Sequence, residues 1–291
     1  MASPFYLVIK GKFVIVGKEP DGDSVRFIAN NPDIYAELHH NYRIKLSRDR
    51  SVQLRFEGVD TPEVHYGKDA QPLGEEARNQ LLAWMGFDNI KFAGNQVQAA
   101  NPDTVSGTIL SKAADANGRP VSYVLLEADA EQLEDEDWIL VDASLLKKTL
   151  NFQLLTEGAA YYTVYTSTPF RHRKLLREAA LSARQDNRGV WAKDATDEFT
   201  LKDKKSITPP NGQLILPKLF RRSIDYLKAV EDGFRGNLKD WLISISEGSR
   251  NENDRLVIRD SVEVRLSDLI EQRNSRIVFQ EDLLNITFVE K

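Results

Sequence analysis

Residues 52–63 read Val-Gln-Leu-Arg-Phe-Glu-Gly-Val-Asp-Thr-Pro-Glu, and this stretch predicts both a strand of the main sheet and the centre of the chemistry. Apolar residues alternate through its first half with Arg55 between them, which is typical of a strand with one buried face. Gly58 permits a kink or bulge, so we expect the strand to leave its sheet just before Asp60.

The loop after this strand holds a backbone carbonyl between two carboxylates. Pro62 ends strand pairing and restricts Thr61 to an extended backbone. The Thr61 carbonyl is therefore kept between the side chains of Asp60 and Glu63, where a hard cation would fit. Taken alone, these four residues could equally be a polar turn after an edge strand, so other segments have to decide.

The composition is that of a soluble globular protein. The 291 residues are 41% hydrophobic and 29% charged, and no apolar run approaches the roughly 20 residues of a bilayer-spanning helix. The net charge of −5 argues against a protein that coats nucleic acid through bulk electrostatics. Because the chain has no cysteine and no visible secretory signal, disulfides and thiolate metal sites are excluded, and we expect a cytoplasmic location.

Two further turns present charged side chains at the ends of expected strands. Residues 21–25 read Asp-Gly-Asp-Ser-Val, where the glycine allows a tight turn and Asp23 stands at the start of a strand. Residues 115–119 read Asp-Ala-Asn-Gly-Arg and precede a strand at 121–126. Arg119 is therefore expected where a hairpin returns to the sheet.

These pieces together supply what phosphodiester hydrolysis requires. Asp23, Asp60 and the Thr61 carbonyl offer hard oxygen ligands that suit Ca²⁺, whereas Zn²⁺ would favour His or Cys. Glu63 can accept a proton from an attacking water. Arg55 and Arg119 can bind phosphate oxygens through planar, permanently charged forks and neutralise charge in the transition state.

The order and local sequence of these motifs resemble the staphylococcal-nuclease family, the thermonucleases. The resemblance rests on residues 21–25, 55–63 and 117–119 and on the closing Arg-Gly-Val-Trp at 188–191, and it covers about residues 5–195. Carried over by position, it implies calcium ligands at Asp23, Asp60 and Thr61, a general base at Glu63, and phosphate-binding arginines at Arg55 and Arg119. Ala116-Asn117 replaces the family's lysine-tyrosine pair, and of its two substrate-binding tyrosines only one aligns readily, at Tyr165.

The resemblance also implies a fold and an activity. The expected fold is α+β, a five-stranded OB-type β-barrel with three helices, an architecture that binds single strands across its open face. The expected activity is calcium-dependent hydrolysis of DNA and RNA, with single strands preferred and 3′-phosphate ends left. A non-catalytic OB-type nucleic-acid-binding or scaffold module is the alternative, but such a module has no need of the carboxylates and arginines all at matching places.

The last third of the chain reads as a separate part. Residues 201–212 contain Lys-Lys-Ser at 204–206 and Pro-Pro-Asn-Gly at 209–212, and they predict a linker between a catalytic domain at 1–200 and a small α+β domain at 213–291. Helical periods at 216–230 and 238–245 precede short strands in that small domain. We expect it to mediate self-association or to bind a partner protein. A C-terminal domain through which a partner protein controls the nuclease is compatible with both roles.

Overall fold

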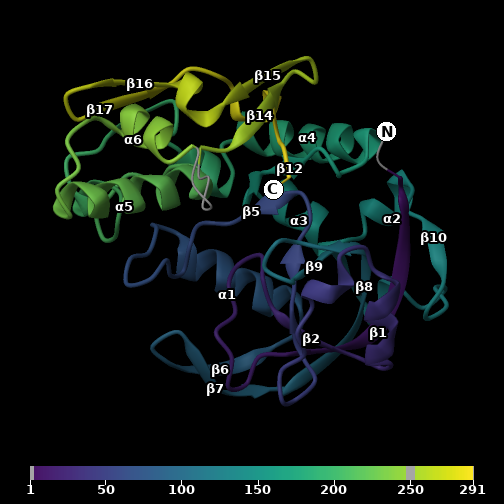
Figure 1. Cartoon of the computed structure of the whole chain (residues 1–291). Helices are drawn as coiled ribbons and strands as arrows, with labels where there is room; N and C mark the ends of the chain where they lie inside the picture. Colours follow the sequence, from purple (N-terminus) through teal and green to yellow (C-terminus); the bar gives the residue numbers. More distant parts are fainter. Residues whose placement is uncertain (1–2, 247–252, 291) are drawn as a thin grey trace.

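A curved sheet forms the lower part of the molecule (Figure 1), and it is built around the stretch quoted above. The computed structural model of the chain describes residues 3–246 and 253–290. The sheet has the strand order β3-β2-β1-β8-β9-β4, and β10 is added beside β1. Its strands are β1 (Phe5–Val14), β2 (Arg26–Ala29), β3 (Val52–Gln53), β4 (Arg55–Phe56), β8 (Thr104–Ala114), β9 (Pro120–Leu126) and β10 (Trp138–Leu140).

Residues 52–56 bring the two edges of this sheet together. β3 pairs antiparallel with β2, with Val52 opposite Phe27, and β4 pairs parallel with β9, with Arg55 opposite Val121. Only Leu54 separates β3 from β4, so one extended segment touches both edges and the sheet becomes a nearly closed barrel. Counting this segment as one strand leaves five strands around the ring, as the sequence predicted.

The bend at the end of this segment needs glycine. Gly58 has φ +83°, and a Cβ there would lie 2.6 Å from the Leu176 side chain. After the bend, β5 (Val59–Asp60) leaves the barrel and pairs instead with β11 (Tyr161–Tyr162), with Asp60 opposite Tyr161. The predicted kink therefore carries Asp60 away from the barrel sheet and into pairing with β11.

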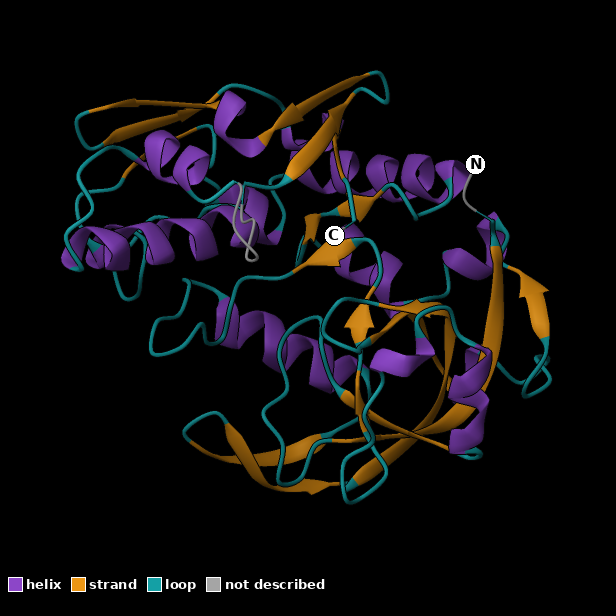
Figure 2. Ribbon diagram, viewed as in Figure 1, coloured by secondary structure: helices purple, strands orange, loops and turns teal. Residues whose placement is uncertain are grey.

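Helices cover one end and one side of the barrel (Figure 2). They are α1 (Gly74–Trp84), α2 (Ala143–Leu146), α3 (Leu150–Thr156) and α4 (Phe170–Gln185), and a hairpin of β6 (Asp88–Ala93) and β7 (Gln96–Asn101) extends below α1. Residues 143–156 form two helices, α2 and α3, rather than one continuous helix. The Thr149 side chain accepts a hydrogen bond from the Phe152 N–H and so caps the N-terminus of a separate helix, α3.

The C-terminal part lies over the same end of the barrel as α4 (Figure 1). It contains α5 (Pro217–Glu231), α6 (Leu238–Ser244), β14 (Arg255–Ile258), β15 (Val262–Arg265), β16 (Ile270–Arg273), β17 (Arg276–Phe279) and β18 (Ile286–Phe288). The sequence had not indicated β7, β10 or β16. The α+β class, the barrel-like sheet and the small C-terminal α+β part are as predicted.

The N-terminal and C-terminal parts share sheets and core. β12 (Val164–Tyr165) pairs parallel with β18, and β13 (Glu198–Thr200) pairs antiparallel with β17. Buried apolar side chains of both parts belong to one cluster, and Leu201 and Ile207 of the expected linker are themselves buried. The division into domains at 1–200 and 213–291 stays a prediction.

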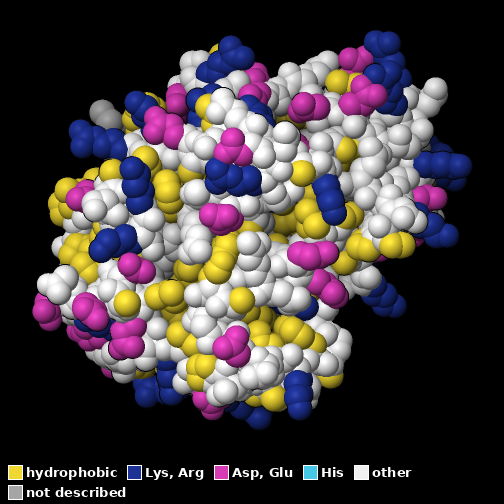
Figure 3. Space-filling model, turned by 180° about the vertical axis from the view of Figure 1, so that it is seen from behind, with side chains coloured by type: hydrophobic (Ala, Val, Ile, Leu, Met, Phe, Trp, Pro, Cys, Tyr) yellow, Lys and Arg dark blue, Asp and Glu magenta, His cyan; other side chains and the backbone are white. Residues whose placement is uncertain are grey.

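Charges on the surface are mixed in sign. On the face seen from behind, Lys and Arg side chains alternate with Asp and Glu (Figure 3), which agrees with the small net charge of the whole chain. Among the described residues, no helix has both the length and the apolar character needed to cross a membrane. Recognition of a charged ligand must therefore depend on local groupings of side chains.

Candidate active site

One cleft of about 700 Å³ gathers every site residue that the sequence predicted. It lies where the β1–β2 turn, the bend after β4 and the β8–β9 turn meet the N-terminal half of α5. Its lining includes Asp21, Asp23, Arg55, Asp60, Thr61, Glu63, Arg119, Tyr165, Lys218 and Arg221. Residues from five separate segments are thus brought together, although the role of each stays a prediction.

Backbone hydrogen bonds fix the acidic side of the cleft. The Phe56 N–H donates to the Asp23 carbonyl at 3.0 Å, which ties the β1–β2 turn to β4. The Thr61 N–H donates to the Asp23 carboxylate at 3.2 Å, so the turn is also tied to the loop after the bend. Asp23 and Thr61 are 38 positions apart in the sequence, and the closure of the barrel brings them into contact.

The acids of the cleft are crowded enough to alter one another's protonation. Burial, followed by the charges of Asp60 and Glu63, raises the pKa of Asp23 to about 7. Burial and the charge of Asp23 raise the pKa of Asp21 to about 7 as well. For Glu63, burial together with the charges of Asp60 and Asp21 outweighs a nearby arginine and brings the pKa to about 7. Such a concentration of acids is typical of a site that takes up a cation.

Asp115 organises the two predicted phosphate-binding arginines. Its Oδ2 accepts a hydrogen bond from Nε of Arg119 at 2.8 Å and lies 2.7 Å from Nη2, so two nitrogens of the guanidinium contact one carboxylate oxygen. The same carboxylate oxygen lies 3.9 Å from Nη1 of Arg55. Both guanidinium groups are therefore held close to Asp115, in the cleft that the acids also line.

Tyr165 contacts Arg55 and is also held by the C-terminal part. Nη2 of Arg55 donates to the Tyr165 hydroxyl at 2.7 Å, and the guanidinium carbon lies 4.6 Å from the ring centroid. The Phe288 ring of β18 packs at 5.8 Å between centroids. Burial alone would raise the pKa of Tyr165, but the charges of Arg55 and Lys218 outweigh it and lower that pKa to about 8.

Arg221, which the sequence did not suggest as a site residue, lies among the predicted catalytic acids. Its Nη1 and Nη2 donate to the two Asp60 carboxylate oxygens at 3.3 and 3.0 Å, and Nη1 also contacts the Glu63 carboxylate. The Arg221 side chain is 23% exposed, and those of Asp60 and Glu63 are 11% and 12% exposed. A cation of the chain itself thus neutralises the predicted metal ligand and the predicted base.

The oxygen atoms of the predicted ligands suit a hard divalent cation. The Arg221 guanidinium, however, lies beside Asp60, where such a cation would bind. Carboxylate oxygens and a backbone carbonyl are ligands that Ca²⁺ prefers. The buried Thr61 hydroxyl has no hydrogen-bond partner among the described residues. In residues 3–246 and 253–290 as they stand, however, no group of three or more His, Asp or Glu side chains is arranged to hold a metal ion. Metal binding at this site would require the guanidinium to leave.

A signal for Arg221 was present in the sequence. Apolar residues of α5 mark its buried face, and polar residues at i, i+3 and i+7 mark a second face: Lys218, Arg221 and Asp225. Lys218 is 7% exposed and contacts Asp254 at 3.6 Å, whereas Asp225 accepts a hydrogen bond from the Tyr66 hydroxyl at 2.7 Å. A row of polar residues on an otherwise buried helix indicates that this face packs against charged groups elsewhere in the chain.

Comparisons with known proteins agree with the geometry. The chain is 26% identical over 219 residues to a protein of Arthroderma otae named "Probable endonuclease LCL3", and the match covers 70% of this chain and 65% of the relative. The chain thus corresponds to somewhat less than two thirds of that relative's length. Residues 53–193 match the sequence model of the family described as "Staphylococcal nuclease homologue". This range includes the bend, both arginines and Tyr165, and it is the part of the chain that is similar to that family.

Proposed function

We propose that this chain is a calcium-dependent nuclease that hydrolyses phosphodiester bonds of DNA and RNA, prefers single strands and leaves 3′-phosphate ends. The observation that carries the proposal is the convergence of Asp23, Asp60 and Glu63 opposite Arg55 and Arg119 in one cleft. Opposed acids and guanidinium groups are what a phosphodiester, a cation and an attacking water require together. A cytoplasmic location stays a prediction from the sequence.

Each residue of the cleft has a role in this proposal. Asp23, Asp60 and the Thr61 carbonyl would hold the Ca²⁺, which when bound would neutralise phosphate charge. Glu63 accepts the proton of the attacking water, and the raised pKa of about 7 suits a group that exchanges protons near neutral pH. Arg55 and Arg119 bind phosphate oxygens, and Asp115 keeps the Arg119 fork turned toward them.

The C-terminal part is proposed to control access to this cleft. Arg221 contacts Asp60 and Glu63, so a divalent cation and the guanidinium would compete for the same oxygens. α5 would then hold the cleft closed until substrate, cation or a partner protein draws it away. Self-association through residues 213–291 is a second way in which such a movement would be driven.

A non-catalytic nucleic-acid-binding module remains the second candidate, because a guanidinium that stays on Asp60 would leave no place for a metal. The two candidates differ in what they predict for cleavage. Labelled single-stranded DNA and RNA are incubated with the full chain in Ca²⁺, in Mg²⁺ and in chelator, and products are treated with a phosphatase to detect 3′-phosphate ends. We expect cleavage in Ca²⁺ alone and a phosphatase-dependent shift of the products.

Two results would contradict the proposal. Cleavage that persists undiminished in chelator would rule out the metal assignment. Failure to cleave in every metal, both by the wild-type chain and by a variant in which Arg221 is replaced by Ala, would favour the binding module. The Arg221 variant matters because a closed cleft would otherwise be mistaken for an inert one.

A further inference from the structure

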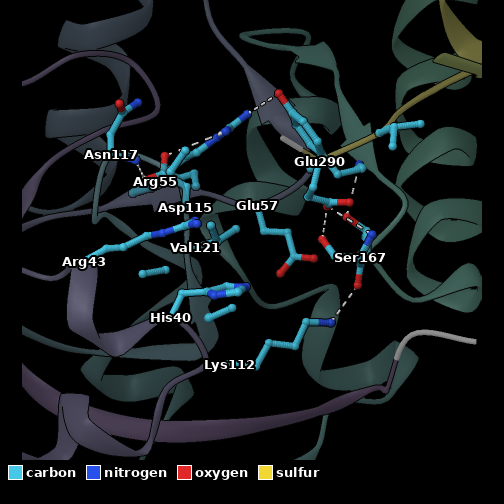
Figure 4. Close-up of a pocket in the computed structure, with 18 of the residues that line it drawn as sticks. His40, Arg43, Arg55, Glu57, Lys112, Asp115, Asn117, Val121, Ser167 and Glu290 are labelled. Atoms are coloured by element: carbon cyan, nitrogen blue, oxygen red, sulfur yellow. Dashed lines mark hydrogen bonds and ion pairs between the residues drawn. The ribbon is translucent and has the colours of Figure 1, made fainter. Parts of the chain in front are cut away.

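A second cavity, of about 280 Å³, adjoins the cleft and carries a buried carboxylate that the proposed chemistry does not use. Arg55, Asn117, Tyr165 and Lys218 line both spaces, so the cavity is continuous with the place where phosphate would bind. We name it the Glu57 cavity after the acid in its wall. In Figure 4, Glu57 projects into the open space between His40, Lys112 and Ser167.

Glu57 is only 4% exposed, yet among the described residues no Lys or Arg forms an ion pair with it. The Tyr6 hydroxyl lies 3.1 and 3.0 Å from the two carboxylate oxygens of Glu57, and burial raises the pKa of Glu57. The charge of Lys112 lowers the pKa of Glu57, but Nζ of Lys112 donates to the carbonyls of Ser3 and Ser167 at 3.1 and 2.8 Å. A buried carboxylate without an ion pair is costly and is uncommon where packing alone is at stake.

The carboxylate keeps acceptor capacity toward the cavity. An ionised carboxylate offers about four lone-pair sites, whereas the Tyr6 hydroxyl supplies a single hydrogen and Thr168 can supply one more. The backbone of Glu57 is fixed, because its N–H donates to the Ser122 carbonyl at 2.9 Å and its carbonyl accepts from the Asn151 amide at 2.9 Å. A fixed acceptor pair therefore faces a space that is open to the substrate.

The remaining walls suit a flat ring. Val121, Ala113 and Ala114 contribute apolar surface, and His40 and Arg43 stand at one side of the opening. A nucleotide with its phosphate on Arg55 could place its base here, because Arg55 borders both spaces. Of the common bases, guanine alone offers two adjacent N–H donors, N1–H and the 2-amino group, that match two acceptors on one carboxylate.

We propose that the Glu57 cavity receives the base of the nucleotide whose phosphate contacts Arg55, and that Glu57 selects guanine by accepting hydrogen bonds from N1–H and the 2-amino group. This inference rests on the proposed nuclease function for its biological setting. The recognition itself is a binding property, however, and can be measured without cleavage.

The test uses the full chain in chelator, so that nothing is hydrolysed, and calorimetric titration with 5′-GMP, 5′-IMP and 5′-AMP. IMP keeps N1–H but lacks the 2-amino group, so the wild-type chain is its own control for folding. We expect GMP to bind more tightly than AMP by roughly 5-fold to 100-fold, the range for one good bidentate base contact, and IMP to bind with an affinity between the two. Equal binding of the three nucleotides would overturn the inference.

Two variants refine the result. Glu57→Gln exchanges one acceptor for a donor and should remove the preference for GMP over IMP, whereas Glu131→Gln makes the same change on an exposed loop residue and should preserve it. A Glu57→Gln chain that is folded by circular dichroism and still prefers GMP would show that Glu57 is a structural acid only. If guanine selectivity is found but no metal supports cleavage, the nuclease proposal fails and the binding inference stands.

Discussion

Arg221 donates two hydrogen bonds to Asp60, at 3.0 and 3.3 Å, across 161 positions of the sequence. The bidentate contact joins a helix of the C-terminal part to the predicted metal ligand in the N-terminal part. In the proposed function, two arrangements of this site would compete, one in which the guanidinium neutralises Asp60 and one in which a divalent cation does. The balance between them would then set how readily the cleft becomes active.

Replacing Arg221 with Ala should tighten Ca²⁺ binding, because the competing charge is removed. The coupling between two such ligands is typically worth a change of about 5-fold to 150-fold in affinity. Calorimetric Ca²⁺ titration of the full chain measures it directly. Lys228→Ala, an exposed residue of the same helix, is the matched control and should leave the affinity as in the wild type. Unchanged Ca²⁺ binding by the Arg221 variant would contradict competition for Asp60.

Glu63→Gln should lower kcat by about 10²-fold to 10⁴-fold while changing KM little, because a general base acts mainly in the transition state. Single-stranded DNA cleavage in saturating Ca²⁺ gives both constants. Glu76→Gln, on the exposed side of α1, provides the comparison. A loss confined to KM would assign Glu63 to substrate binding instead.

Arg119→Lys keeps the positive charge but loses the planar fork that Asp115 holds, and we expect a rate loss of roughly 10²-fold to 10³-fold. Asp115→Asn should lower the rate by less, because it weakens the positioning of Arg119 without removing it. Single-turnover cleavage measures both variants. Full activity of Arg119→Lys would mean that Arg119 does not contact the phosphate.

Tyr165 should ionise near pH 8, a lower pH than ordinary tyrosines require. Burial opposes ionisation, but Arg55 and Lys218 favour the phenolate, so the folded pKa lies below the unfolded value of about 10. The resulting stabilisation is fully present above about pH 10 and is lost as the pH falls through about 8. Ultraviolet titration should detect one early tyrosine among the nine of the chain, absent in Tyr165→Phe and shifted upward in Lys218→Met. A Tyr165→Phe titration that keeps the early step would contradict the assignment.

Asn151→Ala should destabilise the fold by about 2–5 kcal/mol, because it leaves several buried groups without partners. The side chain is fully buried, donates to the carbonyls of Glu57 and Ser122 at 2.9 and 3.0 Å, and accepts from the Val124 N–H at 2.9 Å. Denaturant unfolding gives the change, with the exposed Gln132→Ala as control. A loss below about 1 kcal/mol would show that water replaces these bonds.

The sequence was sufficient for the part of the site that depends on local patterns. Gly58 and Pro62 dictate backbone conformation within a few residues, so the bend that presents Asp60 and Glu63 could be predicted. The turns at 21–25 and 115–119 are local in the same sense. Because the barrel joins these segments, their convergence followed once a closed sheet was expected.

Contacts between distant segments could not be predicted in this way. Arg221 belongs to α5, and the spacing of apolar residues in that segment predicts the helix. The neighbouring sequence does not indicate which carboxylates the polar face of the helix contacts. The parallel pairing of β12 with β18 also lacks a local signal, since both strands are only two or three residues long. For Glu57, its burial beside a cavity is visible only once β4, β8 and the C-terminal segment are in place.

The pairing of β12 with β18 has a consequence for how the protein is made. The hydroxyl of Thr166, directly after β12, donates to the carboxylate of Glu290, two residues beyond β18, across 124 positions. At a synthesis rate of roughly 5–20 residues per second, β18 leaves the ribosome about 6 to 25 seconds after β12. During that interval Tyr165, which contacts Arg55, lacks the Phe288 ring that packs against it. A growing chain therefore carries an unfinished site, and its cleft matures only after β18 has been made.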